Sequence, residues 1–252
     1  MTLKENVREF FQEQNMPRKK RIEYIIINFV LFLVIFYIVL NTIVYDWTGS
    51  LYPEGTGFRL DVVFGGVEDA IPFMGGWIIV YWYVFYPMMI FLMLFFIFAD
   101  SDRGYAVAWS LVIINAAADL VYIFFPVSTF WYRQQLLTQS PGGYWGTIAY
   151  QLFTPGSSHY DTSFDCFPSL HAALSTICFY AWYRYAKINP RPWIKAIACI
   201  TLVLAIGIIL STLFLKQHYI LDLIAGITLA WVVGKLLFNH FWKTPTSTPV
   251  AG

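Results

Sequence analysis

Charged residues are scarce in this chain of 252 residues: 12% are Asp, Glu, Lys or Arg, whereas 58% are hydrophobic. A soluble domain carries about 25% charged residues, so this chain has too few to cover a surface that faces water. The formal net charge of +1 gives no indication of a nucleic-acid partner. These shortages argue against a soluble domain and predict a protein that crosses a membrane several times.

Cysteine is also scarce, with three residues and no Cys-x-x-Cys spacing. Cys178 and Cys199 fall in apolar runs, so neither a disulfide framework nor a zinc knuckle is supported. The N-terminal residues lack the apolar run and the small-residue cleavage site of a signal peptide. Residues 1–21 are therefore expected to form a cytoplasmic leader, either without regular structure or as a short interfacial helix.

Long apolar runs are plentiful by contrast, and six of them approach the roughly 20 residues that a membrane-spanning helix needs. These runs cover residues 22–45, 73–99, 105–126, 169–185, 193–215 and 219–242. The fourth run is the shortest and the most polar at its start, and either hydrophobic mismatch or burial among neighbouring helices would accommodate it. The sequence predicts an all-α fold, with a bundle of six transmembrane helices over residues 22–243 and a cytoplasmic tail over 244–252.

Basic residues are distributed unevenly between the two sides of this bundle. With the N-terminus inside, the cytoplasmic segments hold 12 Lys and Arg residues, and the outer segments hold 3, namely Arg59, Arg133 and Lys216. The positive-inside rule then predicts that both termini are cytoplasmic. The outer loops, at about 46–72 and 127–168, are much longer than ordinary connections. We therefore expect the chemistry of the protein to face outward.

Ionisable residues at membrane depth are candidates for function. His218 and Asp222 lie four residues apart in the segment KQHYILDLIAG and thus share a helix face. A carboxylate there can accept the Nδ1–H of the imidazole and leave Nε2 as a nucleophile or base. His171 begins the fourth run and is predicted to lie at the same outer rim. Beside it, Ser169 is a candidate N-cap at a helix start that suits an oxyanion.

Three kinds of chemistry could use two histidines and one aspartate at the same depth. They could bind zinc or iron, transfer a phosphoryl group through a phosphohistidine, or relay protons in a transporter. The residue types alone leave these alternatives open. A further carboxylate, Asp119, lies deeper in the third run and is expected to pair with Asn115 in helix packing.

Two motifs, PSLH at residues 168–171 and STLFLKQHYILD at 211–222, resemble those of the type 2 phosphatidic acid phosphatase superfamily. The segment VEDAIPFMGGWIIVYWYVFYP at 67–87 is similar to a stretch found in many bacterial members. The resemblance covers most of the chain. It implies six helices, a site on the outer face, and cleavage of lipid phosphate esters without a metal or cofactor.

The resemblance also implies roles for individual residues. His218 matches the nucleophile of the family, Asp222 the aspartate that orients it, and His171 the histidine that protonates the leaving group. Ser169 and Ser211 match serines of the phosphate-binding motifs. Together these residues would form a catalytic site for a lipid substrate that lies in the bilayer.

The chain departs from the family pattern in its cations. Thr212 stands where the family has an arginine, and the lysine-containing first motif is absent after the third run, where Arg133 is the only cation. Because phosphoryl transfer needs positive charge near the phosphate oxygens, we predict that Arg133 and Lys216 supply it. Lys216 would lie on a helix that continues four residues beyond Thr212. These departures resemble the branch that contains inositol phosphorylceramide and sphingomyelin synthases.

The sequence therefore predicts a metal-independent lipid phosphatase that hydrolyses a lipid phosphate monoester or pyrophosphate through a phosphohistidine. One alternative is a phosphotransferase that moves a phospho-headgroup to an acceptor lipid. Another is a non-catalytic lipid-binding relative or a transporter. The predicted location is a bacterial plasma membrane, with the site facing the periplasm or the cell exterior.

Overall fold

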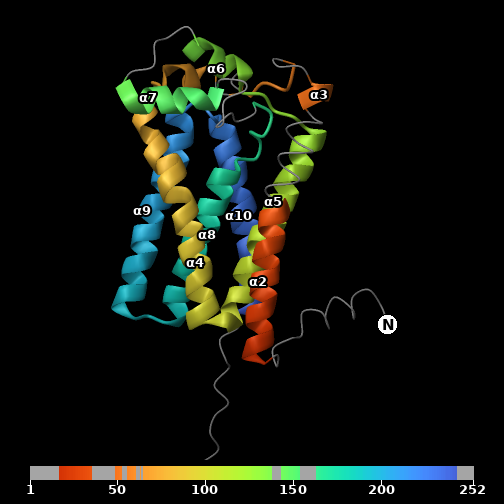
Figure 1. Cartoon of the computed structure of the whole chain (residues 1–252), viewed down its shortest axis with the longest axis vertical. Coiled ribbons are helices and arrows are strands. Elements are labelled where there is room, and N and C mark those ends of the chain that lie inside the picture. Colours follow the sequence, from red (N-terminus) through yellow and green to blue (C-terminus); the bar gives the residue numbers. More distant parts are fainter. Residues whose placement is uncertain are drawn as a thin grey trace, which may run out of the picture.

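The computed structural model describes residues 17–35, 49–52, 56–60, 63, 65–137, 143–153 and 163–242. Most of the predicted leader, residues 36–45 of the first predicted run and the predicted tail lie outside these ranges. No strand occurs among the described residues; isolated β-bridges join Phe58 to Val127 and Val127 to Asp165. Long helices run side by side, and short elements gather at one end of the bundle (Figure 1).

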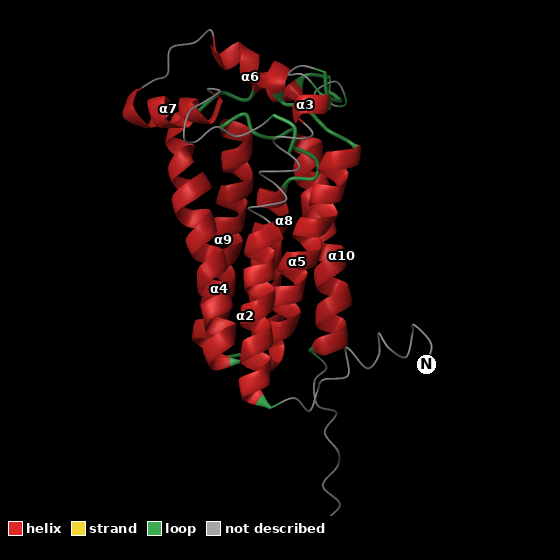
Figure 2. Cartoon of the chain, turned by 45° about the vertical axis from the view of Figure 1, so that its right-hand side comes forward, coloured by secondary structure: helices red, strands yellow, loops and turns green. Residues whose placement is uncertain are grey.

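Six long helices stand in the described part of the chain: α2 (Arg18–Val34), α4 (Phe85–Ala99), α5 (Ser101–Phe124), α8 (Leu170–Ile188), α9 (Pro192–Phe214) and α10 (Ile220–Phe241). The shorter elements are α3 (Gly49–Leu51), η3 (Val67–Ala70), η4 (Gly75–Trp77), η5 (Ile79–Val84), α6 (Phe130–Leu137), α7 (Gly143–Tyr150) and η6 (Gln151–Phe153). Of these, α6 and α7 lie across one end of the bundle (Figure 2).

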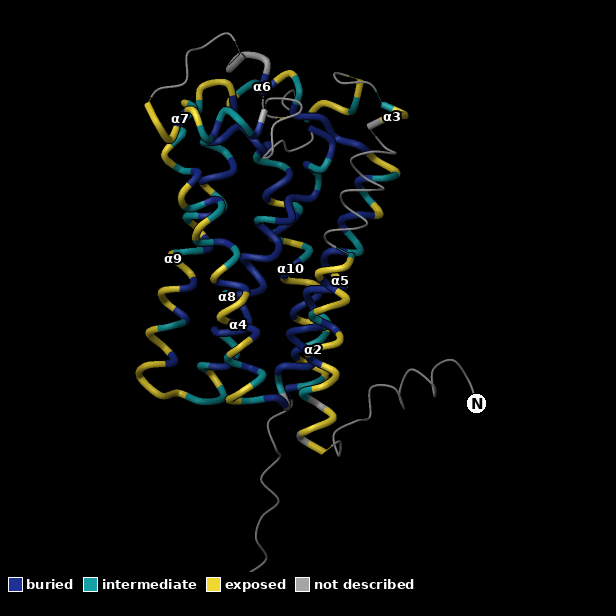
Figure 3. Tube along the Cα trace, in the orientation of Figure 1, coloured by how far each residue is buried: buried dark blue, intermediate teal, exposed yellow. Residues whose placement is uncertain are grey.

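Four helical segments are long and apolar enough to cross a membrane: Gly75–Ala99, Arg103–Phe124, Pro192–Phe214 and Ile220–Phe241. Helix α2 contributes the shorter apolar segment Ile22–Val34. The outer surface of α9 is exposed and apolar, which suits contact with lipid chains (Figure 3). The described chain is thus a mostly helical membrane protein.

Most of the side chains of helix α8 (Leu170–Ile188) are buried. It packs against α4, α5, α9 and α10, and small residues such as Ala172, Ala173 and Ser175 allow this close packing. Surrounded in this way, α8 needs no fully apolar surface. Of the two explanations that the sequence left open for the short fourth run, burial among neighbouring helices is the one that the packing of α8 supports.

The helix that contains α4 begins with a π-helical segment, η5, and becomes α-helical at Phe85. Pro87 follows directly after this change. A proline within a helix has no N–H to donate, and its ring clashes with the carbonyl group four residues earlier. We attribute the widened turn of η5 to Pro87, because this proline interrupts the α-helical hydrogen bonds to the residues of η5.

Helix α9 ends at Phe214, so the prediction that it continues as a helix through Lys216 is wrong. The N–H of Gln217 donates to the carbonyl of Thr212 at 2.8 Å, and that of Lys216 donates to the carbonyl of Leu213 at 3.0 Å. These two bonds form a Schellman cap. Lys216 occupies the left-handed position of this cap, with φ at 56°, and the chain then turns back into α10.

Candidate active site

The two predicted motifs meet where the starts of α8 and α10 touch. The N–H of Ser169 donates to the backbone carbonyl of Asp222 at 3.0 Å. Gly226 faces the same place, and a Cβ atom there would overlap the carbonyl oxygen of Ser169. Glycine is therefore required at position 226 for the backbones to approach this closely. This contact brings His171 and His218 to the same end of the bundle.

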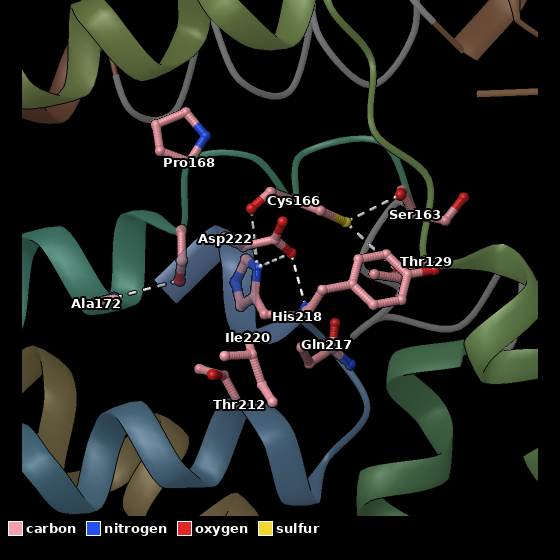
Figure 4. Close-up of polar contacts among 12 residues, drawn as sticks. Thr129, Ser163, Cys166, Pro168, Ala172, Thr212, Gln217, His218, Ile220 and Asp222 are labelled. Carbon is pink, nitrogen blue, oxygen red and sulfur yellow. Dashed lines mark hydrogen bonds and ion pairs between the residues drawn. The ribbon is translucent and has the colours of Figure 1, made fainter. Parts of the chain in front are cut away.

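His218 lies just before α10, between a backbone carbonyl and a carboxylate (Figure 4). Its Nδ1 atom is 3.0 Å from the carbonyl oxygen of Cys166 and 3.5 Å from Oδ2 of Asp222. A backbone carbonyl oxygen can only accept, so the contact with Cys166 holds the proton on Nδ1 and leaves Nε2 for chemistry. The predicted approach of Asp222 is present, but the carbonyl of Cys166 is nearer. Sequence reasoning missed this carbonyl because every residue has one.

Asp222 has a second contact, in which Oδ2 accepts the N–H of Tyr219 at 2.8 Å. This bond satisfies one of the free amides at the start of α10. The carboxylate is completely buried. It therefore fixes the backbone that carries His218 in addition to lying beside the imidazole.

His171 lies in the first turn of α8, and Ser169 is the N-cap of this helix, as predicted. The N–H of Ala172 donates to the Ser169 hydroxyl at 3.3 Å. The imidazole of His171 stacks on Tyr81, with ring centres 4.2 Å apart and an interplanar angle of 24°. Its ring centre is 6.1 Å from that of His218. The structure thus brings the two predicted histidines together.

Arg133 comes to this site from α6. Its guanidinium donates through Nη2 to Oε1 of Gln217, the residue that precedes His218, and both side chains are buried. A guanidinium is planar and always charged, which suits it to phosphate oxygens. The structure therefore places the predicted Arg133 next to the segment that carries His218.

Lys216 is also buried near this segment, but its amine has protein partners. Nζ donates to the backbone carbonyl of Glu68 at 2.9 Å and lies 4.1 Å from the centre of the Tyr132 ring. Burial lowers the pKa of Lys216 to about 8, although the carboxylates of Asp69 and Glu68 act in the opposite direction. Its amine therefore fixes η3, which contains Glu68, in addition to carrying charge.

Ser211 is buried in the last turns of α9. Its hydroxyl donates to the carbonyl of Ile208 at 2.6 Å, and the hydroxyl of Thr212 donates to that of Ile209 at 2.8 Å. Both side chains thus bond to their own helix. Unlike Ser169, Ser211 has no described hydrogen bond to the segments that carry the two histidines.

Glu68 is a buried carboxylate that sequence reasoning did not assign to the site. Its Oε1 accepts the N–H of Ile220, at the start of α10, at 3.4 Å. Its backbone carbonyl accepts from Lys216 and also from the Tyr132 hydroxyl at 3.0 Å. Burial raises the pKa of Tyr132, so that its hydroxyl remains a donor. Its position in the segment 67–87, which resembles a stretch of the family, was the sequence signal that could have identified Glu68 as part of the site.

Two further tyrosines fix the loops around the histidines by the same kind of bond. Tyr122 donates its hydroxyl to the carbonyl of Pro168 at 2.7 Å, and Tyr219 donates to that of Ser128 at 2.9 Å. Both side chains are buried. Such bonds to loop carbonyls hold these loops in one arrangement over the helix ends.

Asp119 lies apart from this cluster, within α5. Its Oδ2 accepts from Nδ2 of Asn115 at 3.0 Å, so the predicted pairing is confirmed. Among the residues that the structure describes, no group of three or more His, Cys, Asp and Glu side chains is arranged to hold a metal ion.

The fold and the site define a helical membrane protein with two histidines at one end of its bundle. His218 is held by a carbonyl and a carboxylate, and His171 by aromatic rings. The family model described as the PAP2 superfamily matches residues 66–236, about two thirds of the chain. The chain therefore belongs to the PAP2 superfamily, the type 2 phosphatidic acid phosphatases, as its motifs predicted. No curated protein and no solved structure matches it. Members of this superfamily are generally phosphatases or phosphotransferases, whereas the synthase branch stays a prediction.

Proposed function

We propose that this protein cleaves a lipid phosphate ester, with His218 as the nucleophile and His171 as the general acid. The observation that carries the proposal is the pairing of the two imidazoles, with ring centres 6.1 Å apart. It is supported by the contact of His218 Nδ1 with the Cys166 carbonyl. A lone pair on Nε2 and an acid on the neighbouring helix are what in-line displacement at phosphorus requires.

The reaction proceeds in two steps. Nε2 of His218 attacks phosphorus, the ester P–O bond breaks, and His171 gives its proton to the departing oxygen. The carboxylate of Asp222, 3.5 Å from Nδ1, stabilises the positive charge on the imidazole. In the second step His171 takes a proton from water, whose oxygen attacks phosphorus, and the P–N bond breaks. This route uses no metal or cofactor and hydrolyses a lipid phosphate monoester or pyrophosphate.

Positive charge for the phosphate comes from Arg133 and Lys216. Arg133 bonds from α6 to Gln217, and Lys216 precedes Gln217 in the chain, so each cation is next to Gln217, the residue before His218. Ser169 and the free amides in the first turn of α8 would bind phosphate oxygens from the other side. Ser211 would join them by rotating its hydroxyl away from Ile208.

The site faces the outside of the membrane in this proposal, and the chain crosses six times with both termini in the cytoplasm. The support is that the histidines lie at the end of the bundle where the long loops gather, whereas Arg103 lies at the opposite end. There its carbonyl accepts from Nε1 of Trp242 at 3.1 Å. The excess of basic residues on the far side from the site supports this orientation, and the motif resemblance to bacterial members points to a bacterial plasma membrane.

Headgroup transfer is a second candidate, favoured by the missing family arginine at Thr212. A phosphate diester carries less negative charge than a monoester and so needs fewer cations. In this version an alcohol of an acceptor lipid replaces water in the second step. The histidines keep the same roles.

The test is turnover of lipid phosphates by the purified protein in detergent, with and without EDTA and an acceptor lipid. We expect His218→Ala to lower turnover at least about a thousandfold, with no effect of EDTA. The matched control is His240→Ala, because His240 is exposed at the other end of α10. Sensitivity to EDTA would support the metal alternative, and turnover only with an acceptor would support transfer. Full activity of both His171→Ala and His218→Ala would refute the enzyme and leave a lipid-binding relative or a transporter.

A further inference from the structure

The imidazole of His171 is enclosed by two aromatic rings that belong to the helix containing η5 and α4. Tyr81 stacks on it as described, and Phe85 lies with its ring centre 4.5 Å away at an angle of 38°. Both aromatic side chains are almost completely buried. They come from opposite sides of the change from π-helix to α-helix, so the widened turn decides where their rings point.

The two rings restrict the orientation of the His171 side chain, whereas the helix cap fixes only its backbone. The N-cap bond from Ala172 to Ser169 fixes the backbone of the first turn of α8. The χ angles of the imidazole are instead limited by ring faces at van der Waals distance. The direction of a ring N–H depends on these angles. A displacement of a reacting group by about 1 Å can lower the rate about a hundredfold. The packing around the His171 ring is therefore expected to affect the rate of catalysis.

We propose that Tyr81 and Phe85 are positioning residues for His171, and that the π-helical turn of η5 exists at this point to aim them at it. The inference rests on the proposed function, in which His171 protonates the leaving oxygen. π-Helical turns are rare and are found frequently at functional sites. The hydroxyl of Tyr81 has no part in this role, which is carried by the ring face.

The proposal can be separated from simple structural support by the choice of leaving group. An alkyl alkoxide leaves only if it receives a proton, whereas p-nitrophenolate leaves without one because p-nitrophenol is a far stronger acid. A residue that aims the general acid therefore affects alkyl esters and spares p-nitrophenyl esters. A residue that only stabilises the fold affects both equally.

The experiment compares kcat/KM for phosphatidic acid and for p-nitrophenyl phosphate in Tyr81→Leu, Phe85→Leu and Tyr81→Phe. We expect the two leucine variants to lose about ten- to a hundredfold on phosphatidic acid and less than about threefold on p-nitrophenyl phosphate. Tyr81→Phe keeps the ring and should stay within about twofold of the unchanged protein on both. The matched control is Tyr83→Leu, since Tyr83 lies in the same π-helical turn but is 62% exposed.

His171→Ala is the reference for this pattern and should show it more strongly than either leucine variant. Equal losses on both esters in Tyr81→Leu and Phe85→Leu, or no loss on either, would overturn the positioning role. If His171→Ala itself reduced both esters equally, the assignment of the general acid in the proposed function would fail instead. Phe85→Leu answers the question if Tyr81→Leu does not fold, and thermal unfolding of each variant identifies that case.

Discussion

The two histidines of the site lie close together, yet their surroundings differ in kind. His218 is held at one atom, Nδ1, by the Cys166 carbonyl and the Asp222 carboxylate. His171 is held across its plane by the rings of Tyr81 and Phe85. A hydrogen bond to one nitrogen determines which nitrogen carries the proton, whereas ring contacts determine the plane without choosing a nitrogen. This difference suits the roles that we propose, in which His218 is a nucleophile with a fixed tautomer and His171 is an acid that gives up and regains its proton.

The polar surroundings of His218 can be weakened by Asp222→Asn, for which we expect the largest effect. The amide oxygen can still accept the N–H of Tyr219, so the start of α10 is preserved, but the negative charge beside the imidazole is lost. We expect kcat on a lipid phosphate to fall roughly a thousandfold. The matched control is Glu23→Gln, because Glu23 is an exposed acidic residue of α2. Near-full activity of Asp222→Asn would mean that the Cys166 carbonyl alone orients His218.

The distance between the two histidines can be changed through Gly226→Ala. The added methyl group would overlap the Ser169 carbonyl and force the start of α8 away from α10. We expect a loss of about 1–3 kcal/mol in stability from overpacking and a fall of about a hundredfold in kcat. Thermal unfolding and turnover in the same detergent measure both effects.

A matched control is available on α9, where a Cβ at Gly207 would come no nearer than 3.6 Å to Val80. Gly207→Ala should leave turnover unchanged and should not destabilise the protein, because alanine is favoured over glycine within a helix. If Gly226→Ala behaved like Gly207→Ala, the close contact between α8 and α10 would have no role in pairing the histidines.

The sequence was sufficient for the parts of this molecule that depend on local patterns. Wherever both ends of a predicted run lie among the described residues, hydropathy located the helix to within a few residues, and the spacing of His218 and Asp222 predicted their approach. The N-cap at Ser169 followed from residue type and position. These features could be predicted because each depends on residues within about one helical turn of one another.

The remaining parts depend on contacts between distant segments, which leave no local pattern. A backbone carbonyl such as that of Cys166 has no sequence signature, and the stacking of Tyr81 on His171 requires the packing of η5 against α8. The helix expected to continue through Lys216 ends early because the Lys216 amine is bound by the carbonyl of Glu68, 148 residues away in the chain. Such a contact can hold a lysine in a left-handed position that usually favours glycine.

The smallest effect that we predict concerns the charge near His218 and appears as a pH dependence. Lys216 has a pKa of about 8 because it is buried, so it is charged below this pH and neutral above it. If its charge helps to hold the phosphate, turnover should fall about three- to tenfold as the pH rises from 7 to 9. Lys216→Arg should remove this part of the fall, since a guanidinium stays protonated in that range, and Lys216→Met should show the low value at every pH.

The same variants separate charge from structure at this position. Arg and Met both retain the long side chain and the left-handed backbone of Lys216, but only Arg can still donate to the carbonyl of Glu68. If Lys216→Arg followed the pH profile of the unchanged protein, the titrating group would lie elsewhere and Lys216 would serve only to hold η3 over the site. If turnover of Lys216→Met equalled that of the unchanged protein at pH 7, Arg133 would be the cation on which the His218 side of the site depends. The positive charge near His218 would then come from Arg133 of α6 and not from Lys216, which lies in the turn that leads into α10.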